Sequence, residues 1–333
     1  MDVKNISPSV ILKSRVRLAR NIVDYPFSPV LNDVCRNEII EKVANALCDC
    51  GYKRLDSSND NLQFLILFEE NKISREFAEE SERHTLFYSS EENIYIMVCE
   101  EDHLRLQAFS DGFDIESAYS RISKCEKQIS EKVRFAFNSE LGYLTHCPTN
   151  LGTAMRASVM MFLPALTLGN RMAELKSLLG KVGVTIRGIY GEGSNADAFI
   201  YQISNSLSLG ISEIDIINKI KSIAEKIAND ELETRSSLFS VNYDKLADKI
   251  MRSYGTLQYA HLLSSAEFFE CYAYTRLGIC QNIIADVELK KIDELLHYAM
   301  PFHIISQNHD SLKDTTLRDK LRAKTVKKVL KEN

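Results

Sequence analysis

T-H-C-P-T-N-L-G-T-A-M-R-A-S-V-M-M, residues 145–161, carries the most specific local signal in the chain. Thr149 and Asn150 are residue types that cap helices, and the apolar run after Gly152 predicts a helix that ends near Leu168. The first turn of a helix presents unpaired N–H groups and a partial positive charge, so it attracts anions. The segment therefore predicts an anion-binding site, although local chemistry leaves an ordinary buried helix equally open.

Two side chains of this segment suit such a site. Arg156 would lie one turn inside the expected helix, where its five guanidinium donors suit phosphate oxygens. Cys147 would lie just before the helix, and the field of the helix would lower the pKa of its thiol. In the alternative interpretation Cys147 is a structural residue.

The residues also resemble a known family. C-P-T-N-L-G-T-x-x-R-A-S-V, residues 147–159, resembles the signature of the ATP:guanido phosphotransferases, the family of the creatine and arginine kinases. M-M-x-L-P-A-L, residues 160–166, resembles the bacterial McsB-type protein arginine kinases. The resemblance covers about residues 10–330 and includes five separate motif blocks.

This resemblance implies an α+β fold, in which an antiparallel β-sheet flanked by helices is followed by an all-helical C-terminal domain. The catalytic part should be similar to guanido kinases and to glutamine synthetase. We expect a catalytic domain over residues 1–235 and a helical domain with a phosphoarginine-binding motif over residues 236–333.

Composition and length are those of a globular protein. The chain has 333 residues, 45% of them hydrophobic and 26% charged. Eight cysteines without metal-ligand spacing indicate free thiols, no metal site and a reducing compartment. The longest apolar run, residues 157–169, is too short to span a bilayer, and the first residues lack a signal-peptide pattern, so we expect a cytoplasmic protein without membrane contact. The net charge of −5 argues against nucleic-acid binding.

V-I-L-K-S-R-V-R-L-A-R-N, residues 10–21, alternates like a strand and places Arg15 and Arg17 on one face. From the residues alone, an edge strand with arginines facing water is the favoured interpretation. The resemblance instead implies that the two arginines bind nucleotide phosphates. The nucleotide site would then include this part of the strand, Ser14, Arg15, Val16, Arg17 and Leu18.

N-I-Y-I-M-V-C, residues 93–99, predicts a strand that ends in three adjacent acids at 100–102. Adjacent carboxylates repel one another unless a cation neutralises them, and a guanidinium substrate is such a cation. A solvated acidic turn is the alternative for these three residues, but it does not explain the arginine at position 105.

The family motif N-E-E-D-H-[LI]-R is matched here, except that Cys99 stands where asparagine is usual. The resemblance implies that Glu101 clamps the substrate guanidinium and takes its proton. Glu100 would support it, and Arg105 would reach the phosphates.

V-T-I-R-G-I-Y, residues 184–190, predicts a strand, and G-E-G-S-N follows it without the G-K-[ST] of a Walker A loop. The resemblance implies a phosphate-binding Arg187 and a second catalytic carboxylate at Glu192. The family usually has glutamate after the serine, and Asn195 stands there instead. Beyond the first strand, the resemblance assigns the following residues to the nucleotide site: His84, Arg105, Arg156, Ala157, Ser158, Val159, Met160, Arg187, Gly188, Ile189, Tyr190 and Gly191.

Hydrophobic periodicity predicts the other elements. Ser212 should cap a long helix whose charged end, residues 229–235, marks the domain boundary, and the chain should be helical from about residue 241. We further expect helices at 32–50, 115–138, 170–179 and after Ser264, and strands at 61–69 and 203–209.

R-D-K-L-R-A, residues 318–323, matches the R-D-x-x-R-A motif with which McsB-type enzymes bind phosphoarginine outside the active site. Arg318 and Arg322 are four residues apart on one helix face and can fork a phosphate, while Asp319 can hold the guanidino part. Ala323 completes the motif. A solvated basic helix is the alternative.

The expected reaction transfers the γ-phosphoryl group of ATP, which carries Mg²⁺, to arginine side chains of proteins. Such transfer requires in-line placement and charge neutralisation, which five arginines would supply. Glu101 and Glu192 would draw a proton from a guanidinium whose pKa is above about 12, with Cys147 as a tuning thiolate. By resemblance the protein is a homodimer with a McsA-like activator protein, a Clp ATPase and a heat-shock repressor as partners, and it marks proteins for Clp proteolysis in the stress response.

Two other functions remain open. One is a kinase for free arginine or another small guanidine. Small-molecule enzymes of the family carry an additional N-terminal helical domain, and only about ten residues precede the first motif here, so we expect a site open to proteins. The other is a non-catalytic phosphoarginine reader, as Cys99 and Asn195 hint.

Overall fold

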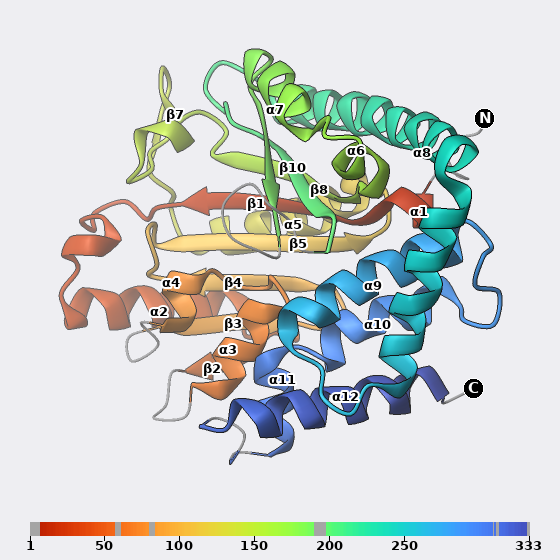
Figure 1. Ribbon diagram of the computed structural model, residues 1–333. Helices are drawn as coiled ribbons and strands as arrows, with labels where there is room; N and C mark the ends of the chain where they lie inside the picture. The colour runs from red at the N-terminus through yellow and green to blue at the C-terminus, as the bar shows by residue number, and fades with distance from the viewer. Residues whose placement is uncertain are drawn as a thin grey trace.

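The computed structural model describes residues 7–56, 61–79, 84–189, 198–308, 310 and 313–331. Its centre is an antiparallel eight-stranded sheet with the order β2-β3-β4-β5-β1-β8-β10-β9 (Figure 1). The strands are β1 (Ile11–Arg20), β2 (Lys53–Asp56), β3 (Thr85–Ser89), β4 (Ile94–Val98), β5 (Leu104–Asp111), β8 (Met155–Phe162), β9 (Val184–Gly188) and β10 (Ile200–Asn205). A separate two-stranded ribbon contains β6 (Phe137–Asn138) and β7 (Gly142–Tyr143).

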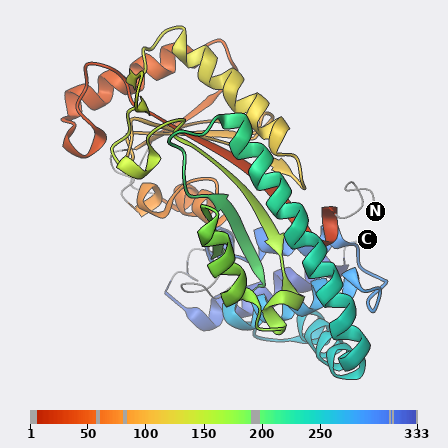
Figure 2. The ribbon, with the colours of Figure 1, turned by 90° about the horizontal axis from the view of Figure 1, so that it is seen from above.

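Helices cover one face of this sheet with apolar side chains, as Figure 2 shows for α5 and the first half of α8. Val16 and Leu18 of β1 point into this core, with 0% and 1% of their surface exposed. The helices of this part of the chain are α1 (Ser7–Val10), α2 (Asp33–Leu47), α3 (Leu62–Glu69), α4 (Arg75–Glu79), α5 (Ile115–Ser130), α6 (Pro164–Leu168) and α7 (Met172–Lys181).

The C-terminal part of the described chain is helical, as predicted. It contains α8 (Glu213–Tyr259), α9 (Ser265–Cys280), α10 (Leu289–Tyr298), α11 (Pro301–Gln307) and α12 (Thr315–Lys331). Its core includes Phe162 of β8 and Ile200 of β10, so these helices pack on one end of the sheet. None of the helices in the described ranges is long and apolar enough to cross a membrane.

The long helix extends further than its charged segment suggested. Ser212 caps α8 as predicted, with its side chain accepting a hydrogen bond from the backbone N–H of Asp215. The helix then continues through residues 229–235 and kinks only at Asn242 (φ −126°, ψ 29°). Glu231 and Arg235 form a buried ion pair inside that charged segment, which explains why the charges do not end the helix. The boundary at residue 235 stays a prediction.

The segment after Gly152 is strand β8, so the predicted helix was wrong. Apart from its half-buried Arg156, β8 is buried along its whole length between β1 and β10. A strand that is buried on both faces shows no alternation of polar and apolar residues, so its sequence resembles a buried helix. Only the short α6, which begins at Pro164, is helical there.

The opposite error occurred at residues 61–69, which form helix α3 instead of a strand. Phe64 of α3 packs against Phe77 of α4 with 5.8 Å between ring centroids. A short apolar run again shows no hydrophobic periodicity that distinguishes a helix from a strand. Other predicted elements are present with shifted ends. They are the helices at 32–50, at 170–179 and after Ser264, and the strands at 10–21, 93–99 and 184–190. Helix α5 ends at Ser130 instead of near residue 138.

Candidate active site

The face of the sheet opposite the α5 core carries a row of arginines. Directly opposed residues of antiparallel strands share a face, and Arg17 of β1 opposes Gln107 of β5 and Arg156 of β8. Arg105 lies two residues before Gln107, so it points to the same face. The strand register thus brings together arginines that are far apart in the sequence.

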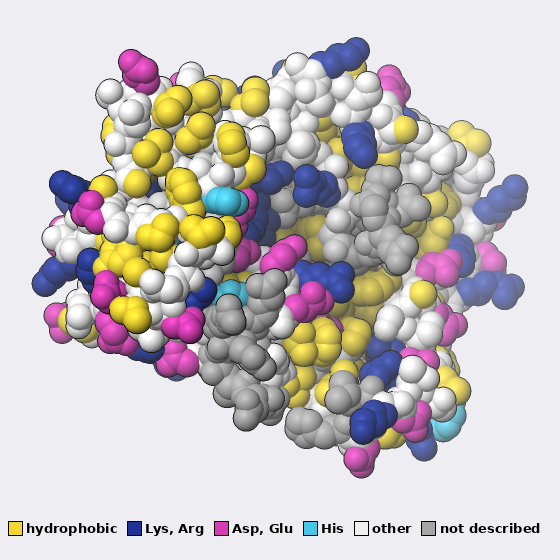
Figure 3. All heavy atoms as spheres, turned by 90° about the vertical axis from the view of Figure 1, so that its left-hand side faces the viewer, with side chains coloured by type: hydrophobic (Ala, Val, Ile, Leu, Met, Phe, Trp, Pro, Cys, Tyr) yellow, Lys and Arg dark blue, Asp and Glu magenta, His cyan; other side chains and the backbone are white. Residues whose placement is uncertain are grey.

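The row continues onto the last two strands of the sheet. Arg156 donates from Nε to Ser204 Oγ of β10 and from Nη2 to Thr185 Oγ1 of β9, both at 3.1 Å. Arg187 lies two residues after Thr185 and is exposed on this face. We call Arg15, Arg17, Arg105, Arg156 and Arg187 the arginine face. In the space-filling view of Figure 3, Lys and Arg side chains gather in a hollow near the centre of the molecule.

The arginine face holds more positive charge than the described residues around it neutralise. Burial and the charges of Arg105 and Arg156 lower the pKa of Arg15 to about 9. Burial and the charges of Arg15 and Arg105 also lower the pKa of Arg17, whose buried Nε has no hydrogen-bond partner among the described residues. The pKa of Arg156 is lowered by burial and by Arg187 and Arg105. An anion with several oxygens would satisfy these groups.

Arg15 is the most buried member, with 8% of its surface exposed. It donates from Nε to Ser158 Oγ at 3.4 Å, from Nη1 to Asn71 O at 3.5 Å, and from Nη2 to Gln202 Oε1. The neutral residues Gln202, Ser204 and Thr185 were missed by the sequence analysis, because no local pattern marks a side chain that contacts an arginine one or two strands away.

Strand alternation separates the predicted nucleotide residues into two groups. Ser158 and Met160 lie on the arginine face. The side chains of the second group point into the core on the opposite face of the sheet. Any contact of these residues with a nucleotide would therefore come from the strand backbone. The group contains Ser14, Val16, Leu18, Ala157 and Val159.

His84 also differs in its surroundings from the other predicted nucleotide residues. Its ring stacks on Phe77 with centroids 4.4 Å apart, and its Nδ1 lies 3.0 Å from Phe77 O. With 6% of its surface exposed, His84 has the contacts of a core residue, and its nucleotide role stays a prediction.

The three carboxylates of the acidic turn between β4 and β5 differ in their contacts and exposure. Glu100 accepts hydrogen bonds from Arg105 Nη1 at 2.8 and 2.7 Å and from Ser74 Oγ. Burial alone would raise the pKa of Glu100, but Arg105 and Ser74 lower it. Glu101 is exposed, and burial of its carboxylate together with the charges of Asp102 and Glu100 raises its pKa. Glu101 is therefore the accessible carboxylate of the turn, and its role as the catalytic base stays a prediction.

Asp102 has a structural task that the sequence analysis missed. It is 3% exposed, and its Oδ1 accepts hydrogen bonds from Asn21 Nδ2 at 2.6 Å and from the backbone N–H of His146 at 2.7 Å. These bonds tie the loop that carries Cys147 to the turn that carries Glu101.

Cys147 lies before a short 3-10 helix, Pro148–Asn150, and is half-buried. Its Sγ is 3.0 Å from Thr149 Oγ1. The long helix whose field was expected to lower the pKa of the thiol is not present, because β8 follows instead. The predicted helix N-terminus is therefore wrong, and an anion bound here would contact side chains of the sheet instead.

The last strand of the predicted site lies partly outside the described residues. Gly188 ends β9, and Ile189 donates from its backbone N–H to Ile200 O at 3.1 Å. Tyr190, Gly191, Glu192 and Asn195 lie outside the described residues, so the second catalytic carboxylate stays a prediction.

The R-D-K-L-R-A motif lies on α12, as predicted, but Arg322 is 1% exposed. Arg322 donates from Nε to Ala299 O at 2.9 Å and from Nη1 to Leu263 O at 2.7 Å and to Asp319 Oδ1 at 2.8 Å. Ala323 is buried in the helical core, and Arg318 is half-buried. The contacts of Arg322 hold α12 against the turns before α9 and α11, and its binding of phosphoarginine stays a prediction.

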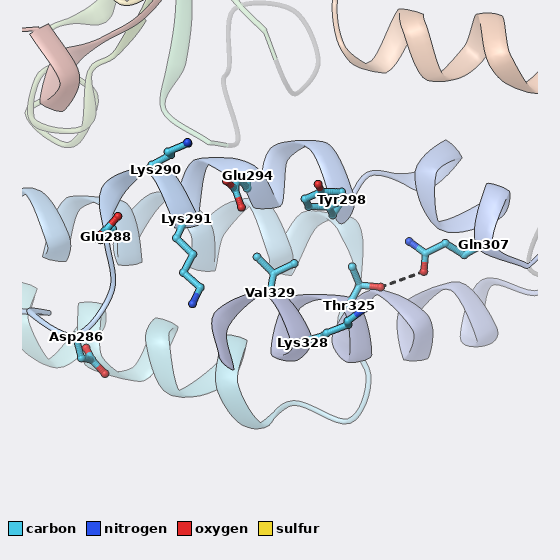
Figure 4. Close-up of a pocket in the computed structure, with 10 residues that line it drawn as sticks. All are labelled: Asp286, Glu288, Lys290, Lys291, Glu294, Tyr298, Gln307, Thr325, Lys328 and Val329. Carbon is cyan, nitrogen blue, oxygen red and sulfur yellow. Dashed lines mark hydrogen bonds between the residues drawn. The ribbon is translucent and has the colours of Figure 1, made fainter. Parts of the chain in front are cut away.

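A cavity of ≈ 870 Å³ lies beside this motif, between α10 and α12 (Figure 4). Its lining includes three lysines, Lys290, Lys291 and Lys328, and three acids, and it includes neither Arg318 nor Arg322. This balance gives the cavity no clear preference for an anion.

Two known families match successive parts of the chain. Residues 35–234 match the family described as ATP:guanido phosphotransferase, C-terminal catalytic domain. Residues 243–333 match the family described as protein-arginine kinase McsB C-terminal domain.

Similar relatives are protein-arginine kinases, and solved structures of lower identity share the fold. A protein-arginine kinase of Clostridium acetobutylicum is 39% identical over 296 residues, which cover 86% of each chain. One of Clostridium kluyveri is 38% identical over 337 residues, which cover 99% of this chain and 97% of the relative. The duplicated taurocyamine kinase of Schistosoma mansoni has a TM-score of 0.61 at 24% identity over 73% of this chain and 37% of that longer chain. Lombricine kinase has a TM-score of 0.61 at 22% identity over 69% and 68% of the two chains. The predicted fold class is thus confirmed.

Proposed function

The chain belongs to the ATP:guanido phosphotransferase family, and on that premise we propose that it is a kinase that transfers the γ-phosphoryl group of ATP to arginine side chains of proteins. The observation that carries the proposal is the excess positive charge of the arginine face beside the accessible carboxylate of Glu101. The first binds a polyanion, and the second accepts a proton.

The arginine face fits a nucleotide triphosphate. Arg17 Nε, which has no hydrogen-bond partner among the described residues, and the lowered pKa values of Arg15, Arg17 and Arg156 indicate groups that gain from an anion. Guanidinium groups bind phosphate oxygens with paired, directed hydrogen bonds. Mg²⁺ carried with the nucleotide supplies further neutralisation of the phosphate charge.

The acceptor requires a base because a protonated guanidinium, with a pKa above about 12, is a poor nucleophile. Glu101 takes one N–H proton as the freed nitrogen lone pair forms an N–P bond and the bond between the γ-phosphorus and its bridging oxygen breaks, leaving ADP. Glu192 would be the second carboxylate that orients the guanidinium. Asp102 holds the Cys147 loop in place through the backbone of His146.

The proposal of protein substrates is supported by the C-terminal domain match and by the names of the relatives. We also propose a homodimer, a McsA-like activator protein, and a role in marking proteins for a Clp ATPase and in controlling a heat-shock repressor. These partners, and a place in the cytoplasm, are supported by the resemblance to McsB-type enzymes.

The test incubates the full chain with Mg-ATP and either an unfolded arginine-rich protein or free arginine, and detects phosphoarginine by mass spectrometry at neutral pH, because the N–P bond is acid-labile. Glu101→Gln is the inactive variant, and Glu131→Gln, an exposed carboxylate after α5, is the matched control.

We expect phosphoarginine on the protein with the wild type and Glu131→Gln, little with Glu101→Gln, and none on free arginine. Transfer to free arginine would contradict the substrate class. No transfer to either acceptor, even with cell extract added, would contradict the kinase and favour a phosphoarginine reader, whose binding should be lost in Arg318→Ala.

A further inference from the structure

A cluster of acids and histidines lies outside the catalytic site, where the end of α3 contacts α10 and α11. His297 Nδ1 lies 2.5 Å from Glu70 Oε1, and His303 Nε2 lies 3.3 Å from the same oxygen. The two imidazole rings have centroids 4.2 Å apart. The three potential ligand atoms all lie within 4.8 Å of one another. Two neutral imidazoles and one carboxylate form a common ligand set for a divalent transition metal.

A second carboxylate lies behind one of these histidines. Glu69 Oε2 is 3.2 Å from His303 Nδ1, on the side of the ring away from Glu70. Glu69 is 7% exposed and is fixed by hydrogen bonds from the backbone N–H groups of Phe302 at 2.8 Å and His303 at 3.2 Å. A carboxylate that accepts the Nδ1 proton of a histidine leaves the Nε2 lone pair free, and ligating histidines in metalloproteins are held in this way.

We propose that Glu70, His297 and His303 bind one divalent transition-metal ion of the zinc type, with Glu69 as the positioning residue that orients His303. Bonds of about 2.0–2.2 Å in a tetrahedral site place ligand atoms roughly 3.3 Å apart. The separation of 3.3 Å between Glu70 and His303 already fits this spacing. Only His297 must move outward, and its side chain is 46% exposed and therefore has room to do so.

A proton is the competing occupant of this cluster. Burial alone would lower the pKa of His303, but its bonds to Glu69 and Glu70 raise it to about 9. Without a metal, a protonated His303 therefore bridges the two carboxylates. Lys72 Nζ, at 2.6 Å from Glu70 Oε2, adds a further cation. The experiment must distinguish a metal site from this proton-held bridge.

The position of the cluster gives a bound ion a structural consequence. It joins α3 to the C-terminal helices, and the segment directly after α3 contacts the catalytic face. Asn71 O accepts a hydrogen bond from Arg15 Nη1 at 3.5 Å, and Ser74 Oγ donates to Glu100. A metal at Glu70 would therefore stabilise the contact between the C-terminal helices and the strands that carry the arginine face.

The test titrates the metal-free full chain with Co²⁺ and follows the visible d–d bands, and then measures the thermal stability with Zn²⁺. His297→Gln and Glu70→Gln remove ligands, Glu69→Gln removes the positioning carboxylate, and His261→Gln, an exposed histidine after α8, is the matched control. Ligation by cysteine would be recognised by an intense sulfur-to-cobalt band in the near ultraviolet.

We expect one equivalent of four-coordinate Co²⁺ without the sulfur band, and a rise in Tm with Zn²⁺. The affinity should fall roughly 10–100-fold in Glu69→Gln, at least as much in His297→Gln and Glu70→Gln, and remain unchanged in His261→Gln. The proposal is wrong if the wild type takes up no stoichiometric Co²⁺, if the sulfur band accompanies binding, or if His297→Gln binds as tightly as the wild type. His297 is half-exposed, so this variant should fold, which circular dichroism will check.

Discussion

Arg105 directs a single nitrogen, Nη1, at both carboxylate oxygens of Glu100, at distances of 2.8 and 2.7 Å. The pair lies where β4 turns into β5, with 26% and 7% of the two side chains exposed. It gives the arginine face its one close carboxylate partner within the described residues and leaves the neighbouring Glu101 free. Adjacent glutamates thus have different tasks: one balances charge, and the other is accessible for proton transfer.

Glu101→Gln should lower kcat by about 10²–10⁴-fold, because an amide cannot accept the guanidinium proton. The Kd of Mg-ATP should change less than about threefold, because Glu101 does not belong to the arginine face. Steady-state kinetics and calorimetric titration of the nucleotide measure the two effects. An equal loss of nucleotide affinity and turnover would show that Glu101 acts in binding instead.

The pH dependence of kcat should reflect the raised pKa of Glu101. The base works only when ionised, so kcat should fall as the pH is lowered through this pKa, at a higher pH than for an ordinary glutamate. Asp102→Asn keeps the acceptor for Asn21 and His146 but removes one repelling charge. Its acidic limb should therefore move to lower pH, and an unmoved limb would contradict the assignment.

Arg17→Gln should stabilise the nucleotide-free protein but weaken its binding of Mg-ATP. Removing a partly buried cation whose Nε has no partner in the described part of the chain should raise the free energy of unfolding without nucleotide by about 1 kcal/mol. The same change should weaken Mg-ATP binding by about tenfold or more, since a hydrogen bond to a charged group contributes roughly 1.5–3 kcal/mol. Urea denaturation and calorimetry measure both.

The control for this variant is Arg252→Gln, which changes an exposed arginine on α8 and should alter both quantities little. Destabilisation of Arg17→Gln would contradict the repulsion among the arginines of the arginine face. Normal binding of Mg-ATP by this variant would contradict the role of Arg17 in phosphate binding.

Gly152→Ala should destabilise the protein by more than about 2 kcal/mol. Gly152 has φ +96°, and an added Cβ would lie 2.2 Å from Ser208 O. The matched control is Gly180→Ala in α7, where no atom of the described residues lies within 4 Å of the added Cβ and alanine should stabilise by about 0.5–1 kcal/mol. Denaturant midpoints compare the two, and equal midpoints would show that the chain before β8 relaxes easily.

Glu231→Ala should cost about 3–5 kcal/mol of stability. The carboxylate of Glu231 accepts hydrogen bonds from the backbone N–H groups of Ala165 and Leu166 at 3.0 Å and from Arg235 at 2.9 and 3.1 Å. Both partners of the ion pair are fully buried, so the substitution leaves an uncompensated cation. Asp248→Ala, in an exposed pair of α8, should change stability by less than about 1 kcal/mol. A similarly small effect of Glu231→Ala would mean that water solvates Arg235.

The sequence motifs named five arginines that the sheet brings onto one face, but the local structure around one of them was predicted wrongly. Arg156 was expected on a helix and lies on β8, where the sheet register places it beside Arg17; its nucleotide role stays a prediction. Asp102 and Ser74 were missed because their task is to hold other segments, and such contacts leave no pattern along the chain. The contact of Glu69 with His303 spans more than two hundred residues, so no local reading of the sequence could predict it.

The most direct test of the shared site uses nitrate, which is planar and negatively charged like the transferring group in a loose transition state. Calorimetry would measure the affinity for Mg-ADP with and without nitrate and an arginine-containing peptide. If the arginine face and Glu101 form one site, nitrate should tighten ADP binding only when the arginine peptide is present, and Glu101→Gln should lose this gain. Tightening that is absent, or equal with a lysine peptide, would contradict the account.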